Sequence, residues 1–160
     1  MNVIVFGATG MVGAGVLIEC LADPLVESTV AVVRSPAGRS HPKLRDVLHT
    51  DFFDYSSLAA DFAACDACFF CLGVSSAGMS EARYSTLTYD LTLAAAHALV
   101  AANTGAVFCY VSGLGTDSSE HGRTMWARVK GRTENALLAL PLGAAYMFRP
   151  AFIQPMHGVR

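Results

Sequence analysis

Three glycines near the start of the chain have the spacing of a phosphate-binding turn. Gly7, Gly10 and Gly13 directly follow the apolar run 2–6 and precede a segment with a helical pattern. Small residues here allow a tight turn, let the backbone approach a pyrophosphate, and leave its charge facing free N–H groups at a helix N-terminus. A glycine turn can also be purely structural, but the strand, turn and helix context favours dinucleotide binding.

A second chemical signal lies at the end of the next predicted strand. In a dinucleotide-binding fold an acid at this place holds the ribose hydroxyls of NAD, whereas an arginine accommodates the 2′-phosphate of NADP. This chain has Arg34 there, followed by Ser35 as a further phosphate donor. NADP is therefore the predicted cofactor, with NAD as the alternative. Arg39, Lys43 and Arg45 follow in a segment without acids, so a solvated basic loop is the competing interpretation.

Three cysteines raise the question of a metal site. Cys65, Cys68 and Cys71 have the spacing of some iron–sulfur loops. Such loops need a turning backbone, but the run 67–72 has the pattern of a buried strand on which Cys68 and Cys71 point to opposite faces. The five histidines are scattered without ligand spacing. We therefore predict buried thiols and no metal site.

The elements that must position these residues alternate between short apolar runs and longer helical patterns. This alternation is typical of β–α units around a parallel sheet. The sequence predicts a single α/β domain over residues 1–160, with a doubly wound parallel sheet (Rossmann fold). The predicted strands are 2–6, 29–34, 45–49, 67–72, 106–111 and 144–148, and the predicted helices are 12–22, a weak one at 56–63, 81–102 and 124–140.

The long predicted helix 81–102 has one apolar stripe. The stripe consists of Leu87, Leu91, Ala95, Ala98 and Ala102. Small residues gather over 94–102, and 53% of the whole chain is hydrophobic. Both features favour a homodimer.

Composition and charge argue against several classes of partner. A net charge of -2 and a pI near 6.2 give no general attraction to nucleic acid or anionic lipid. The most apolar stretch, 91–102, is interrupted by Thr92 and His97 and is shorter than the ~20 residues that a membrane span needs. The N-terminus has no basic leader and runs straight into a strand pattern. We expect a cytoplasmic protein with a small-molecule substrate, which the sequence does not identify.

The motif GATGMVG and its context resemble the short-chain dehydrogenase/reductase family in its extended or atypical form, close to small NAD(P)-binding epimerase-like and NmrA-like proteins. The resemblance runs over the whole chain and implies a Rossmann fold with NAD(P)-dependent oxidoreductase or epimerase chemistry. It also implies cofactor contacts. These are Thr9, Met11 and Val12 in the glycine turn, Asp51 at the end of the third strand beside the adenine, and Cys71, Leu72 and Gly73 after the fourth strand.

The same resemblance extends to the family's catalytic residues. In the family a tyrosine and a lysine four residues apart share one helix face; the lysine binds the ribose and lowers the tyrosine pKa, and the tyrosine transfers a proton. Lys130 matches the lysine and Ser112 the substrate-orienting serine, but position 126 holds Trp. An indole N–H does not ionise usefully, so Trp126 cannot act as acid or base.

Two interpretations of this substitution stay open. Proton transfer is taken over by another residue, for which the candidates are Tyr84, Tyr110 and His121. Alternatively, the chain is a non-catalytic NADP(H)-dependent sensor or interaction protein. Lys130 itself could be an ordinary exposed lysine, but Gly131 beside it costs the helix about 1 kcal/mol relative to alanine, which predicts that something packs closely there.

The C-terminal stretch MFRPAFIQPMHG resembles the strand and Arg-Pro segment that reaches the nicotinamide end of the cofactor in this family. The resemblance implies contacts from Pro150 and Phe152. Family members continue beyond this point into a segment that forms most of the substrate pocket. The sequence given ends at Arg160, so we expect that a C-terminal substrate-binding segment is lacking.

Overall fold

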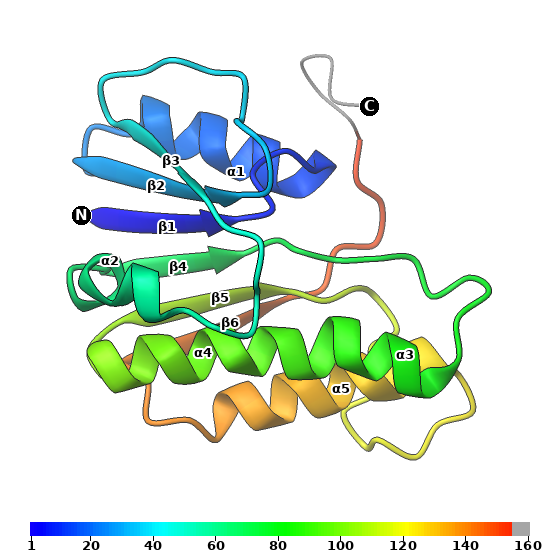
Figure 1. Ribbon diagram of the computed structural model, residues 1–160. Helices are drawn as coiled ribbons and strands as arrows, with labels where there is room; N and C mark the ends of the chain where they lie inside the picture. Colours follow the sequence, from blue (N-terminus) through cyan, green and yellow to red (C-terminus); the bar gives the residue numbers. More distant parts are fainter. Residues whose placement is uncertain (155–160) are drawn as a thin grey trace.

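Six short apolar runs form the strands of one parallel sheet (Figure 1). The computed structural model describes residues 1–154. The strands are β1 (Asn2–Phe6), β2 (Ser28–Val33), β3 (Leu44–Leu48), β4 (Ala67–Phe70), β5 (Val107–Val111) and β6 (Ala144–Phe148). Their order in the sheet is β3-β2-β1-β4-β5-β6, with every neighbouring pair parallel. All six predicted strands are confirmed, with ends that differ by at most two residues.

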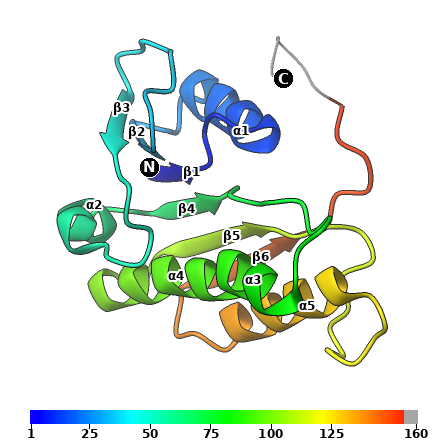
Figure 2. The same ribbon diagram turned by 45° about the vertical axis from the view of Figure 1, so that its right-hand side comes forward.

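Helices cover both faces of the sheet, as Figure 2 shows. The helices are α1 (Met11–Ala22), α2 (Ala59–Ala63) after a 3₁₀ turn at Ser56–Leu58, α3 (Glu81–Ser85), α4 (Leu91–Ala102) and α5 (Met125–Leu138). Leu17 and Cys20 of α1 pack with one apolar cluster, whereas α2, α4 and α5 contribute to the other. The predicted doubly wound α/β fold is therefore confirmed.

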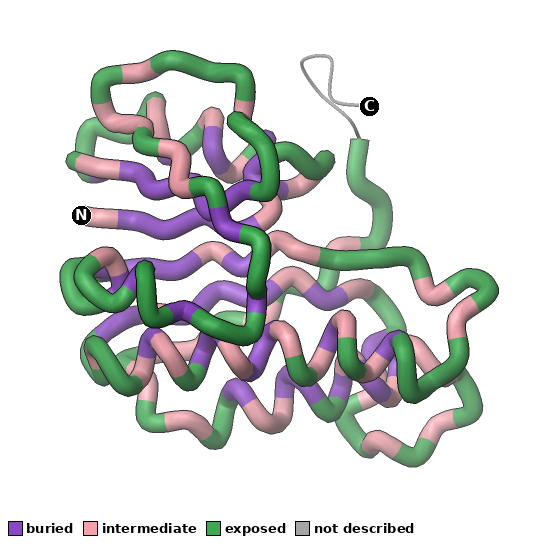
Figure 3. Tube along the Cα trace, in the orientation of Figure 1, coloured by how far each residue is buried: buried purple, intermediate pink, exposed green. Residues whose placement is uncertain are grey.

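The core consists of two apolar clusters, one on each face of the sheet. Within β1, Val3 and Val5 pack on the α1 side, and Ile4 and Phe6 pack on the side of α4 and α5. Figure 3 shows the buried positions concentrated along the central strands. Burial on both faces explains why these runs are continuously apolar instead of alternating with polar residues.

The apolar stripe predicted for the helix 81–102 is confirmed only in part: Leu91, Ala95 and Ala98 pack with the core. A π turn at Thr86–Asp90 joins α3 to α4. Because a π turn contains more residues than an α turn, it changes which residues of the following helix face the sheet. Of the predicted stripe, Ala95 alone is buried, and Ala102 is exposed. The buried positions are Tyr84, Thr88, Thr92, Leu93, Ala95, Ala96 and Leu99.

The order of the strands reverses between β1 and β4. The chain leaves β1 toward β2 on one side, and it leaves β4 toward β5 on the other. In open parallel sheets a crevice forms at this point, outside the carboxyl ends of the two strands. The glycine turn follows β1 and residues 71–73 follow β4, so the fold brings these two predicted binding segments to one crevice.

Candidate cofactor site

Close packing requires two of the three glycines in the turn between β1 and α1. Gly7 has φ +75°, and a Cβ on it would lie 2.9 Å from the carbonyl carbon and oxygen of Cys71. A Cβ on Gly13 would lie 2.1 Å from the carbonyl oxygen of Gly7. Gly10 is exposed, and a Cβ there would approach only the Gly7 oxygen, at 3.3 Å. Gly10 therefore leaves its surface free for a ligand to approach.

The N-terminus of α1 is suited to bind an anion. Gly10 is the N-cap residue, no side chain caps the helix, and its first turn contains no acid. The first N–H groups of a helix have no partner within the helix, and the helix dipole favours negative charge beside them. Backbone groups of Met11 and Val12 can therefore receive a phosphate.

This turn forms one wall of a cavity of about 250 Å³. The other walls come from the carboxyl ends of β4, β5 and β6 and from α5. Nine of the predicted site residues line it, namely Gly10, Met11, Val12, Cys71, Leu72, Gly73, Ser112, Lys130 and Pro150. Val111 and Ile153 also line it, and the sequence interpretation missed both. Each is adjacent or close in sequence to a predicted residue, so a wider window around Ser112 and Pro150 would have included them.

Lys130 is a half-buried residue of the cavity wall. Its Nζ donates to the carbonyl oxygens of Ser112 at 3.0 Å and Val111 at 3.4 Å. An ammonium has three protons, so one is left for a ligand. Burial lowers the pKa of Lys130, and the charge of Glu134 opposes this effect. The interpretation as an exposed helical lysine is therefore wrong.

The close packing predicted beside Lys130 is confirmed. A Cβ on Gly131 would lie 1.7 Å from the carbonyl oxygen of Asp117. The Asp117 N–H donates to the carbonyl oxygen of Ala127 at 3.0 Å. The loop after β5 therefore lies directly against α5, and Gly131 is what allows this contact.

Ser112 belongs to a buried polar network. Its hydroxyl lies 2.5 Å from Glu134 Oε1 and 3.2 Å from the carbonyl oxygen of Phe148. Glu134 is only 2% exposed and accepts from Arg149 Nε at 3.0 and 3.1 Å, with a further ion pair to Arg149 Nη2. The sequence interpretation missed Glu134 and Arg149. The spacing of Glu134 four residues after Lys130 was the available signal, because these positions share a helix face.

Trp126 does not line the cavity. A Cβ added to Gly113 or Gly115 would lie 3.9 or 3.7 Å from its ring, so the indole covers the loop after β5. The three candidate replacements for the tyrosine do not line it either: Tyr84 and Tyr110 are buried, the latter with its ring 5.5 Å from Lys130 Nζ, and His121 is exposed.

Cys71 and Lys130 are the ionisable side chains among the described cavity residues. Burial raises the pKa of the Cys71 thiol to about 12. Cys71 therefore stays protonated near neutral pH. Lys130 is consequently the charged group that this wall offers to a ligand.

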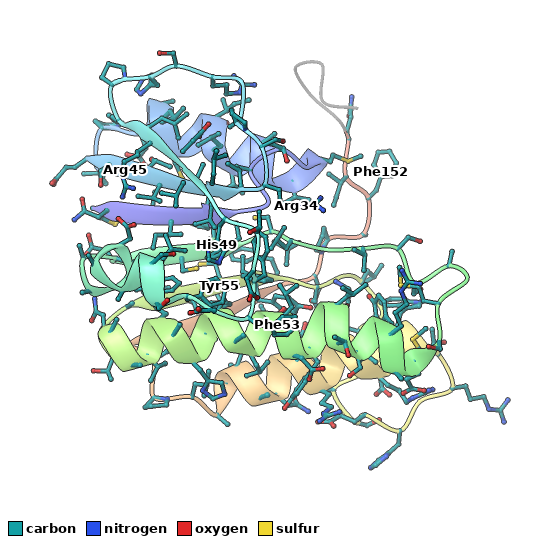
Figure 4. All side chains as sticks on the ribbon, in the orientation of Figure 1. Arg34, Arg45, His49, Phe53, Tyr55 and Phe152 are labelled. Carbon is teal, nitrogen blue, oxygen red and sulfur yellow. The ribbon has the colours of Figure 1, made fainter. Side chains whose placement is uncertain are left out.

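Seven predicted residues do not line this cavity. Gly7 and Gly13 are packed within the glycine turn, and Thr9 is exposed on it. The other four are Arg34, Ser35, Asp51 and Phe152. Arg34 directly follows β2, is exposed, and makes no ion pair within residues 1–154. Figure 4 shows Arg34 at the carboxyl edge of the sheet and Arg45 at the opposite edge. Arg45 pairs with Asp61 and Lys43 Nζ donates to the carbonyl oxygen of Asp23, so both stabilise the fold.

Asp51 and Phe152 lie in exposed segments, and their contacts with a cofactor stay predictions. β3 ends at Leu48, so Asp51 does not end the strand. His49, directly after the strand, is buried and stacks on Tyr55, with ring centroids 5.2 Å apart. Asp51 Oδ1 then accepts from the N–H of Phe53 at 3.0 Å in an exposed loop. Phe152 is 84% exposed.

The cysteines behave as the strand pattern predicts. Cys68 packs in the cluster beneath α4, whereas Cys71 lines the cavity next to α1, which confirms that they point to opposite faces. Within residues 1–154 the side chains form no group of three His, Cys, Asp or Glu that could hold a metal ion.

The helices of this same part of the chain are too short or too polar to cross a bilayer.

Comparison with known proteins gives two sequence relationships. The sequence model of a family described as NAD(P)H-binding matches residues 7–139. The chain is also 31% identical over 159 residues to "Protein fmp52, mitochondrial" of Emericella nidulans, a match that covers 95% of this chain and 66% of that protein.

Solved structures support the same fold. The chain is similar to a short-chain dehydrogenase from Burkholderia cenocepacia in complex with NADP, with a TM-score of 0.73, 16% identity, and coverage of 96% of this chain and 73% of that one. It is also similar to the dTDP-glucose 4,6-dehydratase DesIV from Streptomyces venezuelae with NAD bound, with a TM-score of 0.70, 19% identity, and coverage of 92% and 55%. The chain thus spans about half to three quarters of the length of these proteins.

Proposed function

The chain belongs to the NAD(P)H-binding family, and we propose that it binds NADP(H) at the carboxyl edge of its sheet. The family match confirms the NAD(P)-binding part of the resemblance to short-chain dehydrogenases and epimerase-like proteins, and the solved structures confirm its fold. One observation carries the proposal. The open surface of Gly10, the uncapped start of α1 and the ammonium of Lys130 surround a single cavity at the point where the strand order reverses.

The residues present fit a dinucleotide. Backbone N–H groups of Met11 and Val12 would hold the pyrophosphate, and the free proton of Lys130 would bind a ribose hydroxyl. Cys71, Leu72, Val111 and Pro150 give this part of the cavity an apolar wall. When bound, the nicotinamide would supply or accept a hydride, and this chemistry underlies the proposed oxidoreductase or epimerase-like activity.

The preference for NADP over NAD rests on Arg34. Its guanidinium lies beyond the end of β2, makes no ion pair within residues 1–154, and is followed by Ser35. Neighbouring Lys43 and Arg45 are engaged at the other edge of the sheet, which leaves Arg34 available for a 2′-phosphate. A bidentate arginine contact to phosphate is strong and geometrically selective.

Calorimetric titration with NADPH and NADH tests this preference. We expect NADPH to bind more tightly, and Arg34→Ala to weaken NADPH roughly tenfold or more while leaving NADH within about twofold. Arg45→Ala is the matched control and should leave both affinities unchanged. Equal affinity of the unmodified protein for the two nucleotides would contradict the NADP preference, and binding of neither would contradict the proposed function itself.

A second candidate function is a non-catalytic NADP(H)-dependent sensor or interaction protein. The observation that favours it is the cavity wall, which has neither a tyrosine nor a histidine among its described residues. Loss of a positioned acid or base typically removes about 10²- to 10⁴-fold of rate. NADPH oxidation with a panel of small carbonyl compounds separates the candidates. Turnover by the unmodified protein supports a working reductase. Turnover only in Trp126→Tyr indicates a site that has lost its catalytic tyrosine and with it its activity.

Assembly and location are further proposals. The segment 94–102 of α4 is rich in alanine, and its exposed residues His97, Ala101 and Ala102 support a homodimer through this helix. Light scattering at micromolar concentration tests it, and a clean monomer would contradict it. The relative's name places that protein in mitochondria, and we propose a cytoplasmic location for this chain. Fractionation of cells that express the tagged protein checks this.

A further inference from the structure

Two side chains of α5 hold Ser112 from opposite sides. Lys130 Nζ donates to the carbonyl oxygen of Ser112 at 3.0 Å, and Glu134 Oε1 lies 2.5 Å from its hydroxyl. Lys130 and Glu134 are one helical turn apart, so both face the end of β5. Ser112 is 8% exposed and lines the cofactor cavity.

The partners of the Ser112 hydroxyl determine which way its proton points. A serine hydroxyl has one proton and two lone pairs. Both partners in reach, the carboxylate of Glu134 and the carbonyl oxygen of Phe148, accept hydrogen bonds. The hydroxyl proton of Ser112 is therefore donated to a protein acceptor, and the oxygen keeps a lone pair for the cavity. A ligand group opposite Ser112 must then donate a hydrogen bond, as a hydroxyl or an amide does.

Arg149 allows Glu134 to remain charged in a buried position. It contacts both carboxylate oxygens and also donates from Nη2 to Ser118 Oγ at 2.5 Å. The carboxylate raises the pKa of the Arg149 guanidinium, so this partner is permanently charged. The residue after Arg149 is Pro150, which lines the cavity and accepts from the N–H of Leu114 at 2.9 Å. The ion pair thus also fixes this part of the wall.

We propose that Glu134 is a positioning residue of the cofactor site. It accepts the proton of the Ser112 hydroxyl, so that a ligand beside Ser112 must present a hydroxyl or an N–H. Its negative charge also stabilises the ammonium of Lys130. The role of Glu134 in cofactor binding rests on the proposed function. The contacts themselves exist without a nucleotide and can be tested without one.

The charged and titratable groups around Lys130 are few. Glu134 lies on its own helix, and Tyr110 of β5 presents its ring 5.5 Å from Nζ. Cys71, after β4, lines the same cavity, Arg149, after β6, is paired with Glu134, and the first turn of α1 contains no acid. Glu134 is therefore the one negative partner of Lys130 among these groups, and its removal should lower the lysine pKa.

The chain has two lysines, Lys43 and Lys130, which makes a direct measurement practical. Protein labelled with ¹³C-lysine is titrated by NMR without nucleotide, in the unmodified form and as Glu134→Gln. We expect the Lys130 pKa to fall by about 0.5–1 unit in the variant while the Lys43 signal titrates as before. Glu81→Gln is the matched control, because Glu81 also pairs with α5, through Arg128, but at the surface. It should not move Lys130.

Nucleotide affinity provides the second readout. In Glu134→Gln the Ser112 hydroxyl loses its charged acceptor and is held less firmly by the carbonyl oxygen of Phe148 at 3.2 Å, so we expect NADPH to bind roughly five- to fiftyfold more weakly. When Glu134→Gln is combined with Ser112→Ala, NADPH affinity should be little weaker than in Ser112→Ala alone. The proposal would be overturned if the Lys130 pKa is unchanged in Glu134→Gln, or if the losses of binding free energy in the two single variants add up in the double variant.

Two designs keep this test decisive. If Glu134→Gln fails to fold, the pair Glu134→Gln with Arg149→Met removes both charges together and should lower the Lys130 pKa by a smaller amount, because loss of the Arg149 charge partly offsets loss of the Glu134 charge. If the unmodified protein binds no nucleotide, the proposed function fails, but the NMR titration still decides whether Glu134 supports Lys130. The two failures are therefore distinguishable.

Discussion

The two halves of the site are built in different ways. The half formed by the glycine turn offers backbone groups, and its key positions are fixed by steric contact, as at Gly7 and Gly13. The half formed by β5, α5 and the end of β6 offers side chains that are largely engaged with one another, as Ser112 is with Glu134. The first half is thus prepared for a generic phosphate, whereas the second half defines which chemical group is accepted.

The largest expected effect breaks the glycine half. Gly13→Ala places a Cβ against the backbone oxygen of Gly7, so α1 or the turn must move, and we expect a loss of about 3 kcal/mol of folding stability. Gly15→Ala is the control on the same helix, because a Cβ there meets no atom within 4 Å. It should instead gain about 0.5–1 kcal/mol. Denaturant unfolding measures both, and equal changes would contradict the steric account.

The next effect breaks the side-chain half. Arg149→Met leaves the buried carboxylate of Glu134 without its partner, and we expect a loss of about 3 kcal/mol, the low end of the range for buried pairs because Arg149 is partly exposed. Arg45→Met breaks the more exposed pair with Asp61 and should cost less than about 1 kcal/mol. A loss of the same size in both variants, measured by urea unfolding, would mean that burial of Glu134 does not matter.

A pH series sharpens the comparison. Because burial lowers the pKa of Lys130, the folded protein releases this proton at lower pH than the unfolded chain does. The folded state is therefore penalised below the folded pKa, and stability rises with pH through the interval up to the unfolded value. NADPH affinity should change in the opposite direction and fall roughly tenfold as Lys130 loses its charge.

Lys130→Met gives the reference for this series. Calorimetry between neutral and alkaline pH should show the fall in affinity for the unmodified protein and a nearly flat profile for the variant. Parallel profiles would show that another group controls binding. The glycine half contributes backbone N–H groups, which do not titrate in this interval.

The smallest expected effect concerns the C-terminal contacts. Phe152 is 84% exposed and lies outside the cavity, so Phe152→Ala should leave NADPH affinity within about twofold. Ile153 lines the cavity, and Ile153→Ala should weaken binding about threefold by the loss of apolar contact. A larger loss of affinity in Phe152→Ala than in Ile153→Ala would support the cofactor contact of Phe152 that the resemblance implied.

Sequence reasoning succeeded where local patterns decide the structure. The six strands follow from apolar runs, and the turn at Gly7 to Gly13 follows from a steric requirement within a few residues. It failed where distant partners decide. The π turn at Thr86–Asp90 has no clear local signal, and the buried stacking of His49 on Tyr55 joins residues that no sequence pattern pairs. Glu134 acquires its role only when Ser112 and Arg149 are folded against it.

The central claim is that both halves bind one nucleotide, and an NADPH titration of ¹³C-lysine-labelled protein tests it most directly. The account predicts that the Lys130 signal shifts along a saturable curve that matches the calorimetric affinity, while Lys43, held by the carbonyl oxygen of Asp23, does not change. Saturable binding by calorimetry with an unmoved Lys130 signal would contradict it, because the nucleotide would then occupy the glycine half alone or another surface.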